Sequence, residues 1–276
     1  MICAWDKLLR ILPVRMRDEV NSIGAEKMQE LRLRVDKPPL LCIRKERRTL
    51  SGIVKQEDVD YVINAASAYS PWTAGTVSKG FLTVDGGHRV GLCGEAVMKN
   101  GLLSGIKKIS SINIRVARDF PGASQQIRDF SGSVLLIGPP GSGKTTLLRD
   151  LIRRVAEIGS TAIVDERGEL FPAGCFATGI GIDVLNGCPK PQGIEILLRT
   201  MGPEWIAVDE ITSPDDCEAL VQAGWCGVKV LATAHAFHME DLKLRPIYRP
   251  ILESGLFSTV CILKPDQTYR VERLCL

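Results

Sequence analysis

The chain has 276 residues, of which 45% are hydrophobic and 24% are charged, and its net charge is only +3. This is the composition of an ordinary soluble globular protein, long enough for two domains or one large one and apolar enough for a sizeable core. No stretch approaches the roughly 20 apolar residues of a membrane span, so we expect any association with a membrane to be peripheral.

The first half of the chain predicts an α+β domain. We expect a helix pair broken at Pro13, a strand hairpin that turns at Pro38 and Pro39, a further helix, a second hairpin around the Asp-Gly-Gly turn at residues 85–87, and an edge strand with two arginines. These segments span residues 5–20, 31–44, 57–69, 79–97 and 109–119.

The stretch FPGAS, residues 120–124, contains a proline and a glycine and starts the predicted linker region. We therefore place an N-terminal domain at residues 1–122 and a second domain at 123–276. The second half alternates apolar strands with helices, which favours a mainly parallel, doubly wound sheet. Its predicted strands are residues 133–137, 160–166, 204–211, 227–236, 257–264 and 269–275.

A phosphate-binding loop follows the first of these strands. The sequence GPPGSGKT fits the pattern G-x-x-x-x-G-K-[ST] without a mismatch, and a helical pattern at residues 145–156 follows it. The glycines let successive N–H groups point at phosphate oxygens, and the helix N-terminus favours anions. Lys144 would reach the β- and γ-phosphates of ATP, and the Thr145 hydroxyl would bind Mg²⁺. The predicted nucleotide-binding residues are Gly138, Pro139, Pro140, Gly141, Ser142, Gly143, Lys144, Thr145 and Thr146.

Polar side chains follow three other predicted strands, where ligands bind in open parallel sheets. They are Asp165, Glu166, Asp209, Glu210, Thr233 and His235. Asp209 is placed to hold Mg²⁺ through water. Glu210 can polarise the water that attacks the γ-phosphate, and we expect His235 to sense that phosphate or that water.

The spacing of these motifs favours one class of nucleotide enzyme. A complete strand lies between the phosphate loop and Asp209, and a glutamate follows that aspartate, as in RecA-like motor ATPases rather than GTPases or simple kinases. The chain has no N-K-x-D guanine motif and no L-S-G-G-Q run. The sequence therefore predicts an α/β fold: a RecA-like P-loop ATPase domain with a mainly parallel sheet, preceded by a smaller α+β domain.

The charge distribution and the cysteines say less about function than these motifs do. Residues 1–130 contain 21 Lys and Arg against 14 Asp and Glu, a net charge of +7. Two solvated surfaces of opposite sign would explain this, as would a basic domain facing nucleotide phosphates, an anionic membrane or nucleic acid. The nine cysteines form no CxxC pair and no ligand-like spacing with histidine, which argues against zinc and against a disulfide framework. We expect core cysteines in a cytoplasmic protein, because the N-terminus also lacks an apolar signal-peptide core.

The order of the phosphate loop, VDERGEL, LLRTMGPEWIAVDEI and ATAHA resembles the secretion ATPases of type II and type IV systems. The N-terminal half, through ELRLRVDKPPLL, GTVSKGFLTVDGGHRVGLCGEAV and ISSINIRVAR, resembles the stage III sporulation protein AA family of endospore-forming bacteria, and the likeness covers nearly the whole chain. The first resemblance implies a hexameric ring. The second implies a cytoplasmic ATPase of the mother cell, peripheral to the membrane, beside the membrane proteins of a mother cell–forespore channel.

The resemblance also assigns roles to individual carboxylates. Asp209 and Glu210 match the Walker B pair, although secretion ATPases commonly have Gly-Glu there, and His235 matches the His box. The Asp box is matched by Asp165, Glu166 and Glu169. Because an Asp-box carboxylate can serve as the base in secretion ATPases, the catalytic base stays open between Glu210 and Asp165 or Glu166.

Three arginines enter through the same resemblance. Arg115 and Arg118 fall where secretion ATPases bring arginines of the N-terminal domain to the γ-phosphate, and Arg199 matches an arginine before the Walker B strand. Two residues three positions apart on a strand do not share a face. We therefore expect only one of the first pair to reach the phosphate, and we choose Arg115.

Two other functions stay open. A nucleic-acid-dependent RecA-like ATPase, such as a helicase or packaging motor, would suit the basic half, but aromatic residues make up only 5% of the chain and no aromatic-studded basic groove is visible. Nucleic acid is therefore not the expected partner. A nucleotide-gated scaffold with negligible turnover is the other alternative, and the intact Glu210 argues against it.

Overall fold

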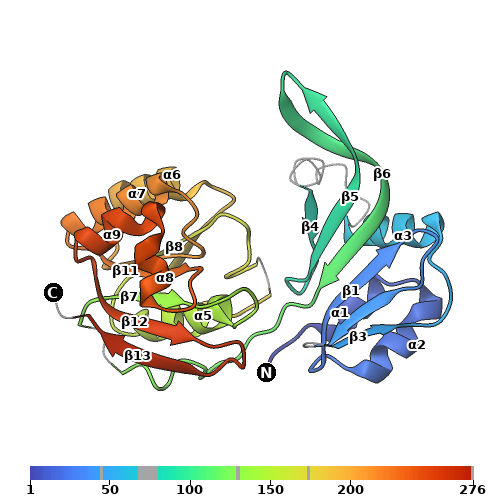
Figure 1. Cartoon of the computed structure of the whole chain (residues 1–276), viewed down its shortest axis with the longest axis horizontal. Helices are drawn as coiled ribbons and strands as arrows, with labels where there is room; N and C mark the ends of the chain where they lie inside the picture. The colour runs from blue at the N-terminus through green and yellow to red at the C-terminus, as the bar shows by residue number, and fades with distance from the viewer. Residues whose placement is uncertain (44–45, 68–79, 129–130, 173–174, 275–276) are drawn as a thin grey trace. The chain divides into compact units, whose positions relative to one another are not determined.

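The computed structural model describes residues 1–43, 46–67, 80–128, 131–172 and 175–274 (Figure 1). The chain divides into two compact units, Met1–Asp119 with Pro172–Phe176, and Phe120–Phe171 with Ala177–Leu276. The first boundary lies at the start of the predicted linker region. Arg44, Tyr69, Lys79 and Cys275, at the ends of predicted segments, fall outside the described residues. Within the described ranges, no helix combines the length and apolar character needed to cross a bilayer.

In its described residues, the first unit is an antiparallel sheet with three helices. The helices are α1 (Trp5–Arg10), α2 (Val14–Ile23) and α3 (Gln56–Ala66). The strands are β1 (Met28–Arg34), β2 (Leu40–Ile43), β3 (Glu46–Thr49), β4 (Phe81–Thr83), β5 (Arg89–Lys99) and β6 (Leu102–Arg115), in the order β3-β2-β1-β6-β5-β4. The predicted helix pair, both hairpins and the third helix are confirmed.

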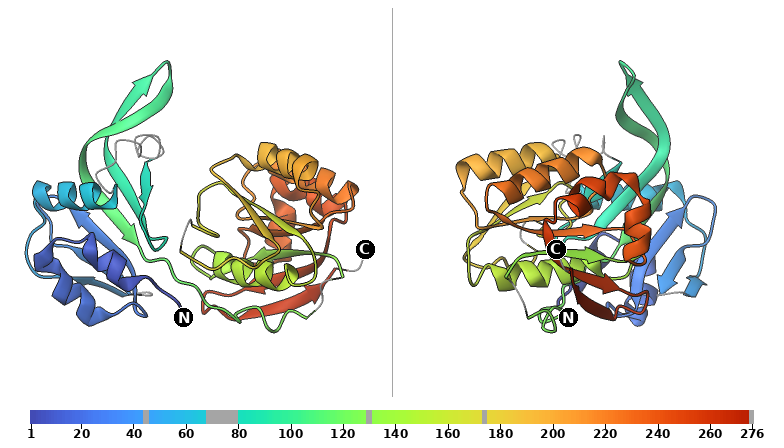
Figure 2. Two further views of the ribbon diagram at one scale, coloured as in Figure 1. Left: turned by 180° about the vertical axis from the view of Figure 1, so that it is seen from behind. Right: turned by 60° about the vertical axis from the view of Figure 1, so that its left-hand side comes forward.

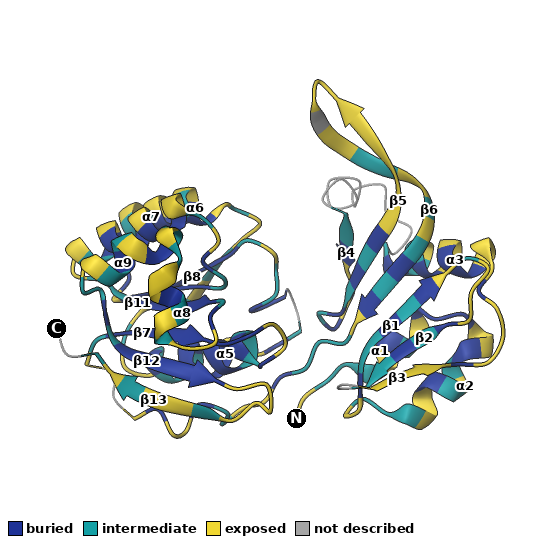
Figure 3. Ribbon diagram, viewed as in Figure 1, coloured by how far each residue is buried: buried dark blue, intermediate teal, exposed yellow. Residues whose placement is uncertain are grey.

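Alternation along the strands builds the core of this unit. Leu31 and Leu33 of β1 and Ile112 and Ile114 of β6 are buried, while the residues between them lie on the other face. The buried strand residues pack in one cluster with apolar residues of all three helices, so the helices cover this face of the sheet (Figure 3).

The predicted edge strand is wrong in its position. β6 pairs with β1 on one side and β5 on the other, so it is a central strand. The hairpin of β5 and β6 turns at Asn100 and Gly101, whose φ angles of 52° and 77° are those of a type I′ turn. The dipeptide Asn-Gly is the strongest short hairpin signal, and it was the cue for the longer strands that the sequence analysis missed.

The second unit is a mainly parallel sheet in the order β13-β12-β7-β11-β10-β8-β9, with only β13 antiparallel to its neighbour. The strands are β7 (Ser133–Ile137), β8 (Thr161–Asp165), β9 (Ile182–Asn186), β10 (Trp205–Val208), β11 (Lys229–Ala234), β12 (Phe257–Leu263) and β13 (Tyr269–Arg273). The helices are α5 (Lys144–Val155), α6 (Lys190–Thr200), α7 (Pro214–Trp225), α8 (Met239–Leu244), the 3-10 turn η2 (Pro246–Tyr248) and α9 (Arg249–Glu253). This confirms the predicted fold class.

Helices cover both faces of this sheet. α5 packs against β7 and β11, and α6 and α7 lie on the opposite face (Figure 2). β9 was not predicted, because its half-exposed sequence IDVLN offers neither an apolar run nor clean alternation. The expectation of core cysteines holds for Cys217 and Cys261, whose burial raises the pKa of each thiol to about 12. It is wrong for Cys93 and Cys226, which are exposed.

Candidate active site

The phosphate loop connects β7 to α5, as predicted. Gly141 and Gly143 have φ angles of 75° and 94°, a region that side chains rarely adopt, so these two turns require glycine. A Cβ at Gly138 would lie only 2.6 Å from Ser142 Oγ. That Ser142 hydroxyl is buried and finds no hydrogen-bond partner among the described residues. An unpaired hydroxyl within a loop of this shape fits a phosphate group.

Lys144, the first residue of α5, points its ammonium group back into the loop. Its Nζ donates to the carbonyl oxygens of Gly138 (2.8 Å) and Pro139 (2.9 Å), and it lies 3.0 Å from Nδ1 of His235. Burial lowers the pKa of the Lys144 amine, while the charges of Asp209 and Glu210 oppose this shift. The lysine is therefore held at the phosphate loop by contacts that a phosphate oxygen can replace.

A group of three oxygen-bearing side chains joins the phosphate loop to the ends of β10 and β11. Thr145 Oγ1 donates to Asp209 Oδ2 at 2.7 Å, and Thr233 Oγ1 donates to Asp209 Oδ1 at 2.6 Å. Hydroxyl and carboxylate oxygens are the ligands that Mg²⁺ prefers in proteins. The donor set of Thr145 and Asp209 therefore fits this ion.

His235 links Lys144 to Glu210. An ammonium group can only donate, so His235 Nδ1 accepts from Lys144 and the ring proton is on Nε2. That Nε2–H lies 3.0 Å from Glu210 Oε1 and donates to it. The other carboxylate oxygen of Glu210, Oε2, accepts from Arg167 at 2.8 Å. Arg167 was not among the predicted site residues, although it lies within the quoted stretch VDERGEL.

The backbone at Glu210 is also unusual. Its φ angle is 53°, in the left-handed region, which costs a non-glycine residue about 1–2 kcal/mol. The Glu210 N–H donates to Thr233 Oγ1 at 2.8 Å, so the neighbouring strand stabilises this conformation. Left-handed residues outside glycine gather at functional sites.

The two Asp-box carboxylates that are candidate bases, Asp165 and Glu166, have other partners. Asp165 is buried, and it accepts the backbone N–H groups of Glu169 (2.9 Å), Leu170 (2.9 Å) and Phe171 (3.0 Å). Burial raises the pKa of the Asp165 carboxyl, and the N–H donors oppose this. Glu166 accepts from the buried Lys190 at 2.7 Å. Asp165 therefore holds the loop that follows β8.

Each of the three candidate arginines has a partner within its own unit. Arg199 is exposed and pairs with Glu195 one turn away on its own helix (2.6 Å). In the first unit, the Arg118 guanidinium is half-buried and donates to the carbonyl oxygens of Glu26 and Met28. The Arg115 side chain is 58% exposed, and its Nε lies 3.5 Å from a Glu30 carboxylate oxygen.

Replacing Asp165 with asparagine is expected to destabilise the second unit. In the native protein these backbone N–H groups donate to carboxylate oxygens, and the substitution places an NH₂ group opposite some of them. The free energy of unfolding should therefore fall by about 1–3 kcal/mol. Urea unfolding measures the change. Asp183→Asn on the exposed part of β9 is the matched control and should leave the unfolding midpoint unchanged.

Comparison with known proteins places the chain beside sporulation proteins. The model of the family "Sporulation stage III, protein AA" matches residues 4–271. "Stage III sporulation protein AA" of Bacillus subtilis (strain 168) is 36% identical over 274 residues, which cover 91% of this chain and 88% of that protein. "Protein SEEDLING PLASTID DEVELOPMENT 1" of Arabidopsis thaliana is 26% identical, over 92% of this chain but only 36% of its own length.

Two solved structures share the fold. The Legionella pneumophila ATPase DotB superposes with a TM-score of 0.61 at 18% identity, over 96% of this chain and 80% of its own. The pilus retraction motor PilT with bound ADP gives a TM-score of 0.61 at 16% identity, over 93% of this chain and 77% of its own. At these identities the likeness is one of fold.

Proposed function

This chain belongs to the sporulation stage III protein AA family, and from that premise we propose that it is an ATPase that hydrolyses ATP to ADP and phosphate with Mg²⁺. The observation that carries the proposal is the hydrogen-bonded connection from Lys144 through His235 to Glu210 beside the phosphate loop. It joins a phosphate-binding cation to a carboxylate that can act on water.

The phosphate loop and its neighbours would hold the nucleotide. Lys144 exchanges its two carbonyl partners for phosphate oxygens, and Ser142 gains the partner that it lacks. Thr145 and Asp209 would bind Mg²⁺. Bound there, the ion would supply charge neutralisation at the phosphate oxygens, which is a main contribution to phosphoryl transfer.

We assign the base to Glu210. Its carboxylate orients a water molecule and accepts the proton that the water loses as the water oxygen bonds to the γ-phosphorus. The bond between that phosphorus and the β,γ-bridging oxygen breaks in the same displacement, and ADP leaves with the bonding electron pair on that oxygen. Glu210 is joined through His235 to the lysine of the phosphate loop, whereas Asp165 accepts backbone N–H groups and Glu166 accepts from Lys190, which supports Glu210 over either of them. When Lys144 turns to the phosphate, His235 Nδ1 loses its donor. The orientation of Glu210 therefore depends on bound nucleotide, which is the sensing role proposed for His235.

We further propose that this ATPase works as a hexameric ring in the cytoplasm, at the membrane proteins of a mother cell–forespore channel. The family membership and the fold shared with DotB and PilT support this assignment. Phosphate release from ATP tests the enzyme, and chelation of Mg²⁺ with EDTA should stop it. Mass measurement with and without ATP tests the ring. No phosphate release would refute the enzyme, and stimulation by DNA or RNA would favour a nucleic-acid-dependent motor instead.

Arg115→Ala is expected to lower the rate of ATP hydrolysis about tenfold, with little change in ADP affinity. A loss of this size corresponds to one charge-assisted hydrogen bond in the transition state. We propose that this exposed arginine contacts the γ-phosphate, a contact that ends on hydrolysis and so couples it to motion of the first unit. Arg118 is the weaker candidate, because backbone carbonyls already hold it. Phosphate release and ADP titration measure the effect.

Arg47→Ala, an exposed arginine on β3, is the matched control for this experiment. Normal turnover in both Arg115→Ala and Arg118→Ala would show that neither arginine contacts the phosphate.

A further inference from the structure

The sheet of the first unit has a basic face. Helices cover one side of this sheet, and Leu31, Leu33 and Ile114 point into that core. Arg32 and Arg34 occupy the alternating positions of β1, so they lie on the side that the helices leave open.

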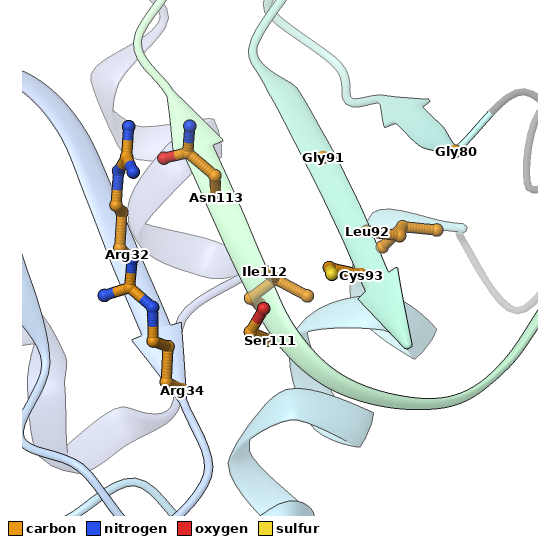
Figure 4. Close-up of a pocket in the computed structure, with 9 residues that line it drawn as sticks. All are labelled: Arg32, Arg34, Gly80, Gly91, Leu92, Cys93, Ser111, Ile112 and Asn113. Atoms are coloured by element: carbon orange, nitrogen blue, oxygen red, sulfur yellow. The ribbon is translucent and has the colours of Figure 1, made fainter. Parts of the chain in front are cut away.

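A pocket of 270 Å³ lies on this open side (Figure 4). Strand register explains its shape. Arg32 is opposite Asn113, which is opposite Gly91; Arg34 is opposite Ser111, which is opposite Cys93. Each row crosses three strands, with an arginine on β1 and small or short side chains on β6 and β5. The hollow exists because Gly91 and Ser111 fill little space.

Several polar groups in this pocket have no partner in the described part of the chain. The Arg34 guanidinium and the Ser111 hydroxyl make no hydrogen bond there, and the Oδ1 atom of Asn113 is buried and unpaired. Arg32 does have a partner, Glu30, at 2.8 Å. None of the described residues that line the pocket is a carboxylate. The free groups are therefore donors for an anion, beside one acceptor that needs a donor.

We propose that this pocket binds a small phosphate ester that carries a hydroxyl group. Phosphate oxygens accept from Arg34, Arg32 and Ser111, and the ligand hydroxyl donates to Asn113 Oδ1. The volume lies just below the usual range for ligand pockets, from about 300 Å³ upward, which suits a molecule of headgroup size. Glycerol phosphate has this chemistry both as a free metabolite and as the headgroup of phosphatidylglycerol. None of these residues belongs to the ATPase site, so the inference stands apart from the proposed function.

Cys93 supplies a local measurement on the full-length protein. Its exposed thiol ends one row of the pocket, and the exposed Cys226 of the second unit serves as an internal reference. The rate of alkylation by N-ethylmaleimide is followed at both thiols by mass spectrometry. Glycerol 3-phosphate should slow alkylation of Cys93 severalfold and leave Cys226 unchanged. Methyl phosphate, which lacks the hydroxyl, should need about tenfold higher concentration for the same protection.

Two variants connect the protection to the pocket. Arg34→Gln should raise the half-protecting concentration about tenfold, since it removes a charge-assisted hydrogen bond. Arg47→Gln, a matched exposed arginine outside the pocket, should not. Protection by vesicles of phosphatidylglycerol at lower phosphate concentration than free glycerol 3-phosphate assigns the lipid source, and the reverse assigns the metabolite. Four results would overturn the proposal. Two of them are protection of Cys93 by sodium chloride at equal ionic strength as well as by the phosphate, and equal protection of Cys226. The other two are protection that is unchanged in Arg34→Gln, and no protection of Cys93 by either probe.

Discussion

Lys144→Ala is expected to lower ATP hydrolysis by at least about a hundredfold, the usual loss when one group that stabilises transition-state charge is removed. Lys144 is the lysine that α5 places against the phosphate loop, and alanine leaves the β- and γ-phosphates without that cation. ATP should also bind more weakly. Phosphate release and nucleotide titration measure the two effects.

The control for Lys144→Ala must separate chemistry from folding. Lys144 Nζ bonds two loop carbonyls, so the variant loses hydrogen bonds as well as charge. Circular dichroism should show an intact fold, and Lys243→Ala on the exposed side of α8 should hydrolyse ATP normally. Unchanged hydrolysis in Lys144→Ala would refute the assignment of the whole site.

Glu210→Gln is expected to bind ATP but to turn it over about a hundredfold more slowly, as expected for loss of a general base. Glutamine keeps the size of the side chain and still accepts from His235 or Arg167, but it cannot take a proton from water. The nucleotide should therefore stay bound, and any ring formed with ATP should persist. Single-turnover hydrolysis and mass measurement with ATP test both effects.

Glu166→Gln is the matched control for the base, since it removes a carboxylate of equal size at the neighbouring strand end. It should keep most of its activity, because Glu166 accepts from Lys190, whereas Glu210 is the carboxylate joined through His235 to Lys144. Asp165→Asn should reduce stability before it reduces turnover at a temperature where the fold is intact. If either variant traps ATP while Glu210→Gln stays active, the base lies in the loop after β8.

The sequence predicts best where a pattern has a direct physical cause. β7, β8 and β10 are buried throughout, and their apolar runs predicted them. Parallel strands end at one edge of a sheet, so the closeness of Asp209 and Thr233 was predictable as well. The partners of side chains that contact loops were not predictable from the sequence. The three N–H groups that bind Asp165 come from an irregular turn, and nothing in the residue types indicates where such N–H groups point.

Strand order shows the same limit. The alternation of β6 predicted a strand, but pairing partners distant in sequence decide whether a strand is central or at an edge. The register that aligns Arg34 with Ser111 and Cys93 likewise depends on three strands at once. The amino-acid sequence includes the residues of that pocket, but it does not show that three strands bring them side by side.

Asp165 holds the turn of Glu169, Leu170 and Phe171 at the end of β8, and the chain then runs directly into Pro172–Phe176, which belongs to the first unit. The two units are therefore joined by three covalent crossings, and no single cut yields both of them whole. Cleavage at the boundary after Asp119 would deprive the first unit of the strap whose Cys175 Sγ accepts from the Gly86 N–H.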